Sequence, residues 1–382
     1  MLDGRAKKII AFLKEKLAEE TEPSRNMLKT YSDYIKDEAT DEDLEKAVID
    51  LLGDLPGNRV LIDHFLDRAE EAESDSICDG TDVEMVGIME HIEPAGIHSG
   101  DSSAVLPPFS LSENVINKIE KYTKKIAMAM DVRGLLNIQF AVKEEEVYVI
   151  EANPRASRTV PFVAKARGIP IAKIAAKIMT GDLLENILTD NDYKKLETFN
   201  VKESVFPFNK FDGVDLILGP EMKSTGEVMG IDSTFLSAFA KSQIACGTIL
   251  PSKGKVFISI NDDNKKFILT IVKKLIDLNF IIVATKGTAK FLNDNNLNVE
   301  TINKVKEGGS HIVKAITDNL IDLVINTTKT QGSIRDSYSI RRTSLTFNVP
   351  YYTTIAGAKV AVDTIEHLKN NNLKVKSLQD LI

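Results

Sequence analysis

The stretch from Gln139 to Arg158 carries side chains whose types and spacing suit a cation and phosphate. Two apolar, β-prone runs flank the charged residues 143–146, which is the signature of a hairpin. In such a hairpin Gln139 and Glu151 lie opposite each other on one face, and Asn153 follows one pleat step beyond Glu151. Amide and carboxylate oxygens suit Mg²⁺, which substrate phosphates and water then complete. Arg155 and Arg158 suit phosphate oxygens.

The alternative is that these side chains form only a polar edge of the hairpin and bind nothing. Polar residues gathered at the end of an apolar strand are more typical of a site than of a core. A second polar cluster, residues 91–102, contains two His, two acids, two Gly and two Ser. Its spacing does not match a zinc site, and no Cys lies near. It is either a structured turn or a loop of backbone donors that, with His98, surrounds a ribose or phosphates.

A third cluster follows two apolar runs of the last third, at Thr285-Lys286-Gly287-Thr288 and Asn326-Thr327-Thr328. Hydroxyls, backbone donors and a helix N-terminus there favour an anion. The competing reading is an ordinary helix start. Four cations are candidates to converge on the same place or to remain solvated: Lys265, Lys304, Arg341 and Arg342.

The elements that must position these residues divide the chain in two. Helices are expected over 1–20 and 41–52, and strands over 60–65, 76–79 and 84–93. A long helix over 112–130, the hairpin 135–151, helices at 160–168 and 171–179, and strands within 199–230 complete an α+β region ending near 244. From 247 strands alternate with helices, which indicates a doubly wound parallel sheet. Its ligands are expected beyond the carboxyl ends of the strands.

Composition narrows the class of protein. The 382 residues suffice for two or three domains, and no apolar run is long enough to span a bilayer. Two cysteines in separate regions and no secretion signal fit a reducing cytoplasm. The net charge of −8 disfavours a nucleic-acid partner.

These motifs resemble a known family. Residues 59–244 are similar to the second ATP-grasp half of the carbamoyl-phosphate synthase large subunit, through residues 60–66, 77–80, 87–93, 96–102, 151–155, 206–211 and 219–230. Residues 247–382 resemble the methylglyoxal-synthase-like regulatory domain that closes that subunit, through 285–289, 303–305 and 326–328. The resemblance divides the chain into a helical remnant (1–58), a partial ATP-grasp domain (59–244) and a methylglyoxal-synthase-like domain (245–382).

The resemblance also implies roles. Phosphorylation of carbamate by ATP, with Mg²⁺ or Mn²⁺, is the implied reaction, and it feeds arginine and pyrimidine synthesis. Gln139, Glu151 and Asn153 would hold the divalent ions, and Arg155 would act on the phosphates. Gln139 and Glu151 would also join the nucleotide pocket, whose other residues would be His64, Leu66, Glu71, Gly96, Ile97, His98 and Ser99. An effector of the UMP or IMP type would bind Lys265, Thr285, Thr288, Lys304, Asn326 and Thr328.

This sequence departs from the family pattern in several places. We find no glycine-rich phosphate flap upstream of Arg59, and the first ATP-grasp half is absent. Residues 71–75 are more polar than the strand expected there. We therefore expect partners, namely a glutaminase small subunit or a chain that supplies the missing parts. The alternative is a non-catalytic nucleotide-binding regulatory fragment. Methylglyoxal production is not expected, because Ser310 follows Gly308-Gly309 where that enzyme has an Asp.

Overall fold

The computed structural model describes residue 49 and residues 66–188, 196–211, 213–307, 311–329 and 331–377. The chain forms two compact units, Met1–Asp67 and Arg68–Ile382. In the first unit Ile49 lies in a helix, while the expected strand over 60–65 lies outside the described residues. Among the described residues, none of the helices is both long and apolar enough to cross a membrane.

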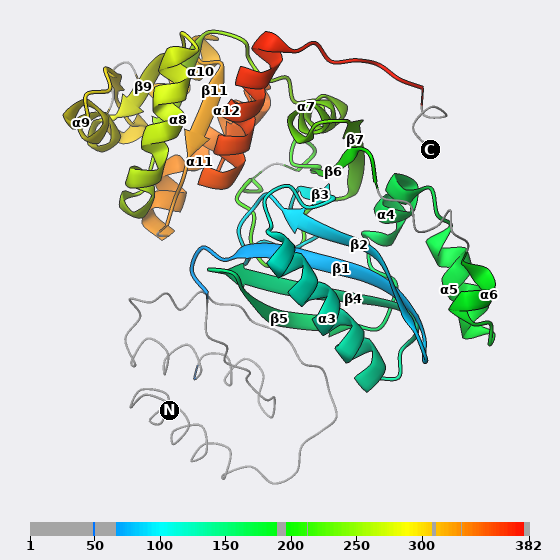
Figure 1. Cartoon of the computed structure of the whole chain (residues 1–382). Helices are drawn as coiled ribbons and strands as arrows, with labels where there is room; N and C mark the ends of the chain where they lie inside the picture. The colour runs from blue at the N-terminus through cyan, green and yellow to red at the C-terminus, as the bar shows by residue number, and fades with distance from the viewer. Residues whose placement is uncertain are drawn as a thin grey trace. The chain divides into compact units, whose positions relative to one another are not determined.

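The first part of the second unit is a seven-stranded antiparallel sheet of order β5-β4-β1-β2-β3-β6-β7 (Figure 1). Its strands are β1 (Glu70–Asp79), β2 (Val83–His91), β3 (Ala104–Leu106), β4 (Arg133–Lys143), β5 (Glu146–Asn153), β6 (Phe199–Val205) and β7 (Gly226–Asp232). The helices are α3 (Glu113–Ala129), α4 (Val160–Arg167), α5 (Ile171–Met179), α6 (Leu184–Ile187) and α7 (Phe235–Ala245). The expected helix over 112–130 and hairpin over 135–151 are confirmed.

Two hydrophobic cores cover opposite faces of this sheet. Helix α3 buries Val115 and Ile119, four residues apart on one stripe, against Ile138 and Phe140 of β4. Ser112 caps that helix by accepting from Val115 N. Helices α4 and α5 pack on the other face, against alternate residues such as Ile77 of β1.

Strand β1 begins six residues earlier than the sequence suggests, because its first half is polar yet buried. Glu71, Glu73 and Asp75 are at most 3% exposed. Their side chains point to one face, while Ser74, on the other, bonds the Thr123 hydroxyl at 2.8 Å. Alternation of charged and small residues therefore reflects a polar site within the sheet and not a solvated loop.

The second part is a five-stranded parallel sheet of order β10-β9-β8-β11-β12 with helices on both faces, as expected. Its strands are β8 (Lys255–Ser259), β9 (Ile281–Thr285), β10 (Glu300–Ile302), β11 (Leu323–Asn326) and β12 (Tyr351–Tyr352). Its helices are α8 (Lys265–Asp277), α9 (Lys286–Asp294), α10 (Ile312–Thr317), α11 (Gln331–Thr346) and α12 (Ile355–Asn370), with 3₁₀ turns η2 (Asp262–Asn264) and η3 (Val305–Glu307). The sequence did not predict α11, β10 or β12. Helix α11 is rich in Ser and Thr, which are weak helix formers.

Candidate functional site

The hairpin register places the three proposed cation ligands on one face. Gln139 pairs with Glu151 across β4 and β5, and Asn153 pairs with Asn137, with a bulge after Gln139. Asn153 Nδ2 donates to Glu151 Oε1 at 2.8 Å. Glu151 is exposed, while Gln139 and Asn153 are half-buried. The structure thus brings the three oxygen-bearing side chains together where solvent can reach them.

This donor set fits a magnesium-type ion. One carboxylate and two amides supply hard oxygen ligands but little charge, so an incoming polyphosphate is the natural complement. Among the residues that the structure describes, no group of three His, Cys, Asp or Glu side chains could hold a metal by itself.

The loop between β2 and β3 packs against the same face. Gln139 Nε2 donates to Ser99 Oγ at 2.9 Å. His98 Nδ1 accepts from Gly100 N at 3.0 Å, and His98 N donates to Gly219 O at 2.8 Å. Burial lowers the pKa of His98, which keeps the imidazole neutral for that turn. The loop is therefore a structured turn, and it also contacts the proposed cation ligand Gln139.

Next to the hairpin face, buried acidic side chains of β1 surround a buried histidine of β2. His91 Nε2 lies 3.4 Å from Glu73 Oε1, and His91 Nδ1 lies 3.5 Å from Glu71 Oε1. Burial alone would lower the pKa of His91, but the two carboxylates outweigh it and raise it. Burial raises the pKa of Glu71 to about 7, although His91 opposes this. The backbone N–H of Gly96 donates to the same Glu71 carboxylate.

Asp75 ties the turn that follows β5 to the sheet. Its carboxylate accepts from Asn137 Nδ2 at 2.9 Å, Ser157 Oγ at 2.8 Å and Thr159 Oγ1 at 2.7 Å. Burial and the Glu73 charge raise the pKa of Asp75 to about 6. Ser157 and Thr159 flank the exposed Arg158, so this anchor fixes where the basic turn leaves the sheet.

The two arginines of that turn lie at the surface beside the hairpin face. Arg155 Nη1 donates to Ala156 O at 3.2 Å, and Arg158 Nη1 contacts Met222 Sδ. Of the remaining proposed nucleotide residues, Gly96 and Ile97 lie half-buried in the β2–β3 loop and Leu66 opens the described segment. His64 lies outside the described residues. Sequence reasoning missed Asp75, Ser157 and Thr159, although the hydroxyls directly after Arg155 were a usable signal.

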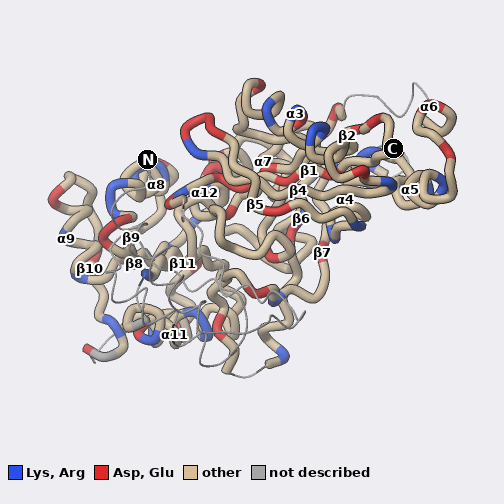
Figure 2. The backbone as a smooth tube through the Cα atoms, turned by 90° about the horizontal axis from the view of Figure 1, so that it is seen from below, with Lys and Arg blue, Asp and Glu red and all other residues tan. Residues whose placement is uncertain are grey.

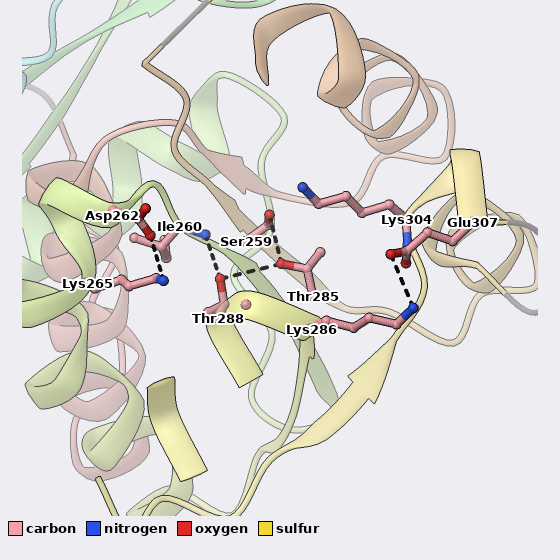
Figure 3. Close-up of a pocket in the computed structure, with 10 residues that line it drawn as sticks. Ser259, Ile260, Asp262, Lys265, Thr285, Lys286, Thr288, Lys304 and Glu307 are labelled. Atoms are coloured by element: carbon pink, nitrogen blue, oxygen red, sulfur yellow. Dashed lines mark hydrogen bonds and ion pairs between the residues drawn. The ribbon is translucent and has the colours of Figure 1, made fainter. Parts of the chain in front are cut away.

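A cavity of about 290 Å³ opens at the carboxyl edge of the parallel sheet (Figure 3). Its lining residues are Ser259, Ile260, Asp262, Lys265, Thr285, Lys286, Gly287, Thr288, Lys304 and Glu307. Figure 3 shows the hydroxyls of Ser259, Thr285 and Thr288 in a chain, with Thr288 Oγ1 accepting from Ile260 N at 3.1 Å.

Charge in this cavity is slightly positive, because three lysines face two acids. Lys265 Nζ lies 2.6 Å from Asp262 Oδ1, and Lys286 Nζ lies 3.2 Å from Glu307 Oε1. Thr285 precedes the first turn of α9 and makes no side-chain cap bond to it, which leaves backbone N–H groups for an anion. Four of the proposed effector residues line the cavity: Lys265, Thr285, Thr288 and Lys304.

The other candidates of this region lie elsewhere. Asn326 ends β11 and donates through Nδ2 to Ser259 O at 3.2 Å, and Thr328 follows it; neither lines the cavity. Arg341 is 1% exposed and donates to both oxygens of Asp215, with Nε to Oδ1 at 2.7 Å. Arg342 Nη1 donates to Phe208 O at 2.9 Å. Neither arginine lines the cavity, and Arg341 is not solvated either, so both alternatives are wrong for Arg341; Arg342 is half-buried.

Comparisons with known proteins follow the same division. Residues 36–187 match the family model "Carbamoyl-phosphate synthase L chain, ATP binding domain", and residues 267–353 match "MGS-like domain". The carbamoyl phosphate synthase large chain of Acidobacterium capsulatum is 50% identical over 84% of this chain and 30% of its own length. That of Archaeoglobus fulgidus is 50% identical over 89% of this chain and 32% of its own length. The chain thus spans about a third of these relatives.

Among solved structures, a biotin carboxylase from Campylobacter jejuni aligns at 16% identity with a TM-score of 0.44, over 54% of this chain and 52% of that one. The sequence relatives, at about 50% identity, are far more similar to this chain.

Proposed function

The chain belongs to the carbamoyl phosphate synthase large-chain family, of which it spans about a third, and on that premise we propose that it supplies one wall of a carbamate-phosphorylating ATP site. The hairpin face of Gln139, Glu151 and Asn153 supports this most directly, because it joins hard oxygen donors to a turn with two arginines. The substrates are ATP and carbamate, and the product is carbamoyl phosphate for arginine and pyrimidine synthesis in the cytoplasm.

Each residue has a physical role in this proposal. Gln139, Glu151 and Asn153 would hold Mg²⁺ or Mn²⁺, which would neutralise phosphate charge. Arg155 and Arg158 bind the phosphate oxygens, and loop 96–99 contacts the nucleotide. A carbamate oxygen attacks the γ-phosphorus, the γ-phosphorus–oxygen bond to the β-phosphate breaks, and ADP leaves with the electron pair. Such transfer needs chiefly positioning and charge neutralisation.

Equilibrium dialysis with radiolabelled ATP and Mg²⁺ tests the proposal. Glu151→Gln removes the single carboxylate ligand, and we expect affinity to fall about tenfold or more, a loss of about 1.4 kcal/mol or greater. Glu146→Gln is the matched control, since Glu146 lies exposed on the same strand and pairs only with Lys118 at 3.1 Å. Equal ATP affinity in wild type and both variants would reject the hairpin as the site.

Turnover by this chain alone is a separate question. Because the chain spans about a third of its relatives, we expect no carbamoyl phosphate from the purified chain, and activity only with a partner that supplies further ATP-grasp parts or with a glutaminase subunit. A coupled assay with ornithine transcarbamylase measures this. Product formed by the chain on its own would overturn the need for such a partner.

The parallel-sheet cavity favours a second role, binding of a phosphate-bearing nucleotide effector. Lysines, hydroxyls and the N-terminus of α9 converge there, as an anion requires. Calorimetry with UMP and with IMP should show binding that Lys304→Met and Thr288→Ala weaken. Lys290→Met, exposed on the same α9, should leave it unchanged. Effector binding without any ATP affinity would support the alternative of a non-catalytic regulatory fragment.

A further inference from the structure

Gln139 can serve a cation only through its oxygen, so the orientation of its amide matters. An amide presents an oxygen and an NH₂ group on opposite sides, and a free side chain can turn either one toward Glu151. In the structure Nε2 donates to Ser99 Oγ at 2.9 Å. The oxygen therefore points away from Ser99. This hydrogen bond holds the Gln139 side chain beside the loop with its oxygen available to a cation.

The position of Ser99 depends in turn on its loop, which hydrogen bonds from β6 hold in place. Lys202 Nζ donates to Ser99 O at 3.2 Å, and Ser204 Oγ donates to Gly100 O at 2.8 Å. Ser224 Oγ reaches the same Gly100 carbonyl at 2.9 Å. The carbonyls of two successive loop residues are thereby fixed from a rigid strand, and the Ser99 hydroxyl follows.

Lys202 is unusual in this set because it is a buried cation. It is 1% exposed, and burying an ammonium is costly unless charge and hydrogen bonds compensate it. The Glu73 and Glu93 carboxylates act electrostatically with Lys202, while its hydrogen bond goes to the loop backbone. The hydrogen bond from Nζ to Ser99 O thus links this buried charge directly to the loop backbone.

We propose that Lys202 is a positioning residue for the cation site: it fixes the 98–101 loop so that Ser99 holds the Gln139 side chain in place. This proposal rests on the proposed function, because it identifies the series of contacts that supports one of the proposed cation ligands. Groups that orient metal ligands from behind typically change affinity by about 10- to 100-fold when removed.

Hydrogen exchange tests the first step without any ligand. Gly100 N donates to His98 Nδ1 and Asp101 N donates to His98 O at 2.8 Å, so both amides report loop order. Lys202→Met should raise exchange of peptides covering 96–103 by about tenfold. Lys241→Met is the control: Lys241 also bonds a backbone carbonyl, Ile231 O, at 3.0 Å but lies away from the loop. Unchanged loop exchange in Lys202→Met would overturn the proposal.

Mn²⁺ titration followed by electron paramagnetic resonance tests the second step. Lys202→Met and Ser99→Ala should both weaken Mn²⁺ binding about tenfold or more, and Lys202→Arg, which keeps the charge and donors, should recover part of it. Ser99→Ala removes no buried charge, so it serves if Lys202→Met fails to fold. Wild-type affinity in Ser99→Ala would also overturn the proposal. No Mn²⁺ binding by wild type would instead refute the proposed function, while the exchange result still decides the role of Lys202 in the loop.

Discussion

At the residue scale, the sheet carries a polar layer that must satisfy itself away from water. Glu73, Asp75 and His91 are each at most 3% exposed, and each has a partner on a neighbouring strand or on the turn after β5. Figure 2 shows acidic residues, in red, on the backbone around β1 and its neighbouring strands. Such residues hold the site in place, but their burial also makes stability depend on protonation.

Asp75 should be among the most costly residues of the layer to remove. Asp75→Ala leaves the donors of Asn137, Ser157 and Thr159 without their acceptor, and we expect a loss of about 2–4 kcal/mol in the free energy of unfolding. Urea denaturation followed by circular dichroism measures it. Asp131→Asn, at an exposed ion pair, should change the free energy of unfolding by less than about 0.5 kcal/mol. Equal effects of the two substitutions would contradict the anchoring role.

Stability should also fall as pH rises from about 5 to 8. Burial, with the Glu93 charge, raises the pKa of Glu203 to about 8, and burial raises that of Glu71 to about 7. The folded protein then retains protons that the unfolded chain has released, so raising the pH favours unfolding until the folded pKa is passed. Urea midpoints at several pH values check this. Glu203→Gln should reduce the decrease of the urea midpoint with pH, whereas the exposed control Glu227→Gln should not. A wild-type midpoint that rises with pH would contradict this prediction.

At the element scale, the hairpin and the long helix could be predicted because their periodicity and turn chemistry are local. The first half of β1 could not, since Glu71, Glu73 and Asp75 look like solvated residues until β2, β4 and the turn after β5 supply their partners. Helix α11 could not be predicted from the sequence for a similar reason. Its sequence is weakly helical, and tertiary contacts such as the buried Arg341 stabilise it.

That contact predicts a strong coupling between α11 and the segment before β7. Arg341 is buried and paired on two oxygens with Asp215, so Arg341→Met should cost about 3–5 kcal/mol by leaving a partly buried carboxylate unpaired. A double-mutant cycle with Asp215→Asn should give a coupling above about 1 kcal/mol. The exposed pair Lys255–Glu300 should give about 0–0.5 kcal/mol. A similar coupling energy for both pairs would contradict the view that the Arg341–Asp215 pair joins α11 to the segment before β7.

At the scale of the whole molecule, an antiparallel sheet with the proposed cation face is followed in the same chain by a parallel sheet with the proposed effector cavity. The sequence predicted an α+β region with its hairpin, the parallel sheet that follows, and the pairing of Gln139 with Glu151, because the hairpin turn defines register. It could not predict that Lys202, 63 positions beyond Gln139 in number, would support the same ligand through a loop. Contacts of that kind depend on strand order, which local patterns do not encode.

The central claim is that Gln139, Glu151 and Asn153 together bind the divalent ion of a nucleotide. An anomalous difference map from crystals of the full chain soaked with Mn²⁺ and ADP measures this directly. We predict one peak within bonding distance of Gln139 Oε1 and the Glu151 carboxylate, with phosphate density beside it, and its loss in Glu151→Gln. A peak at other residues, or nucleotide bound without any metal at this face, would contradict the account.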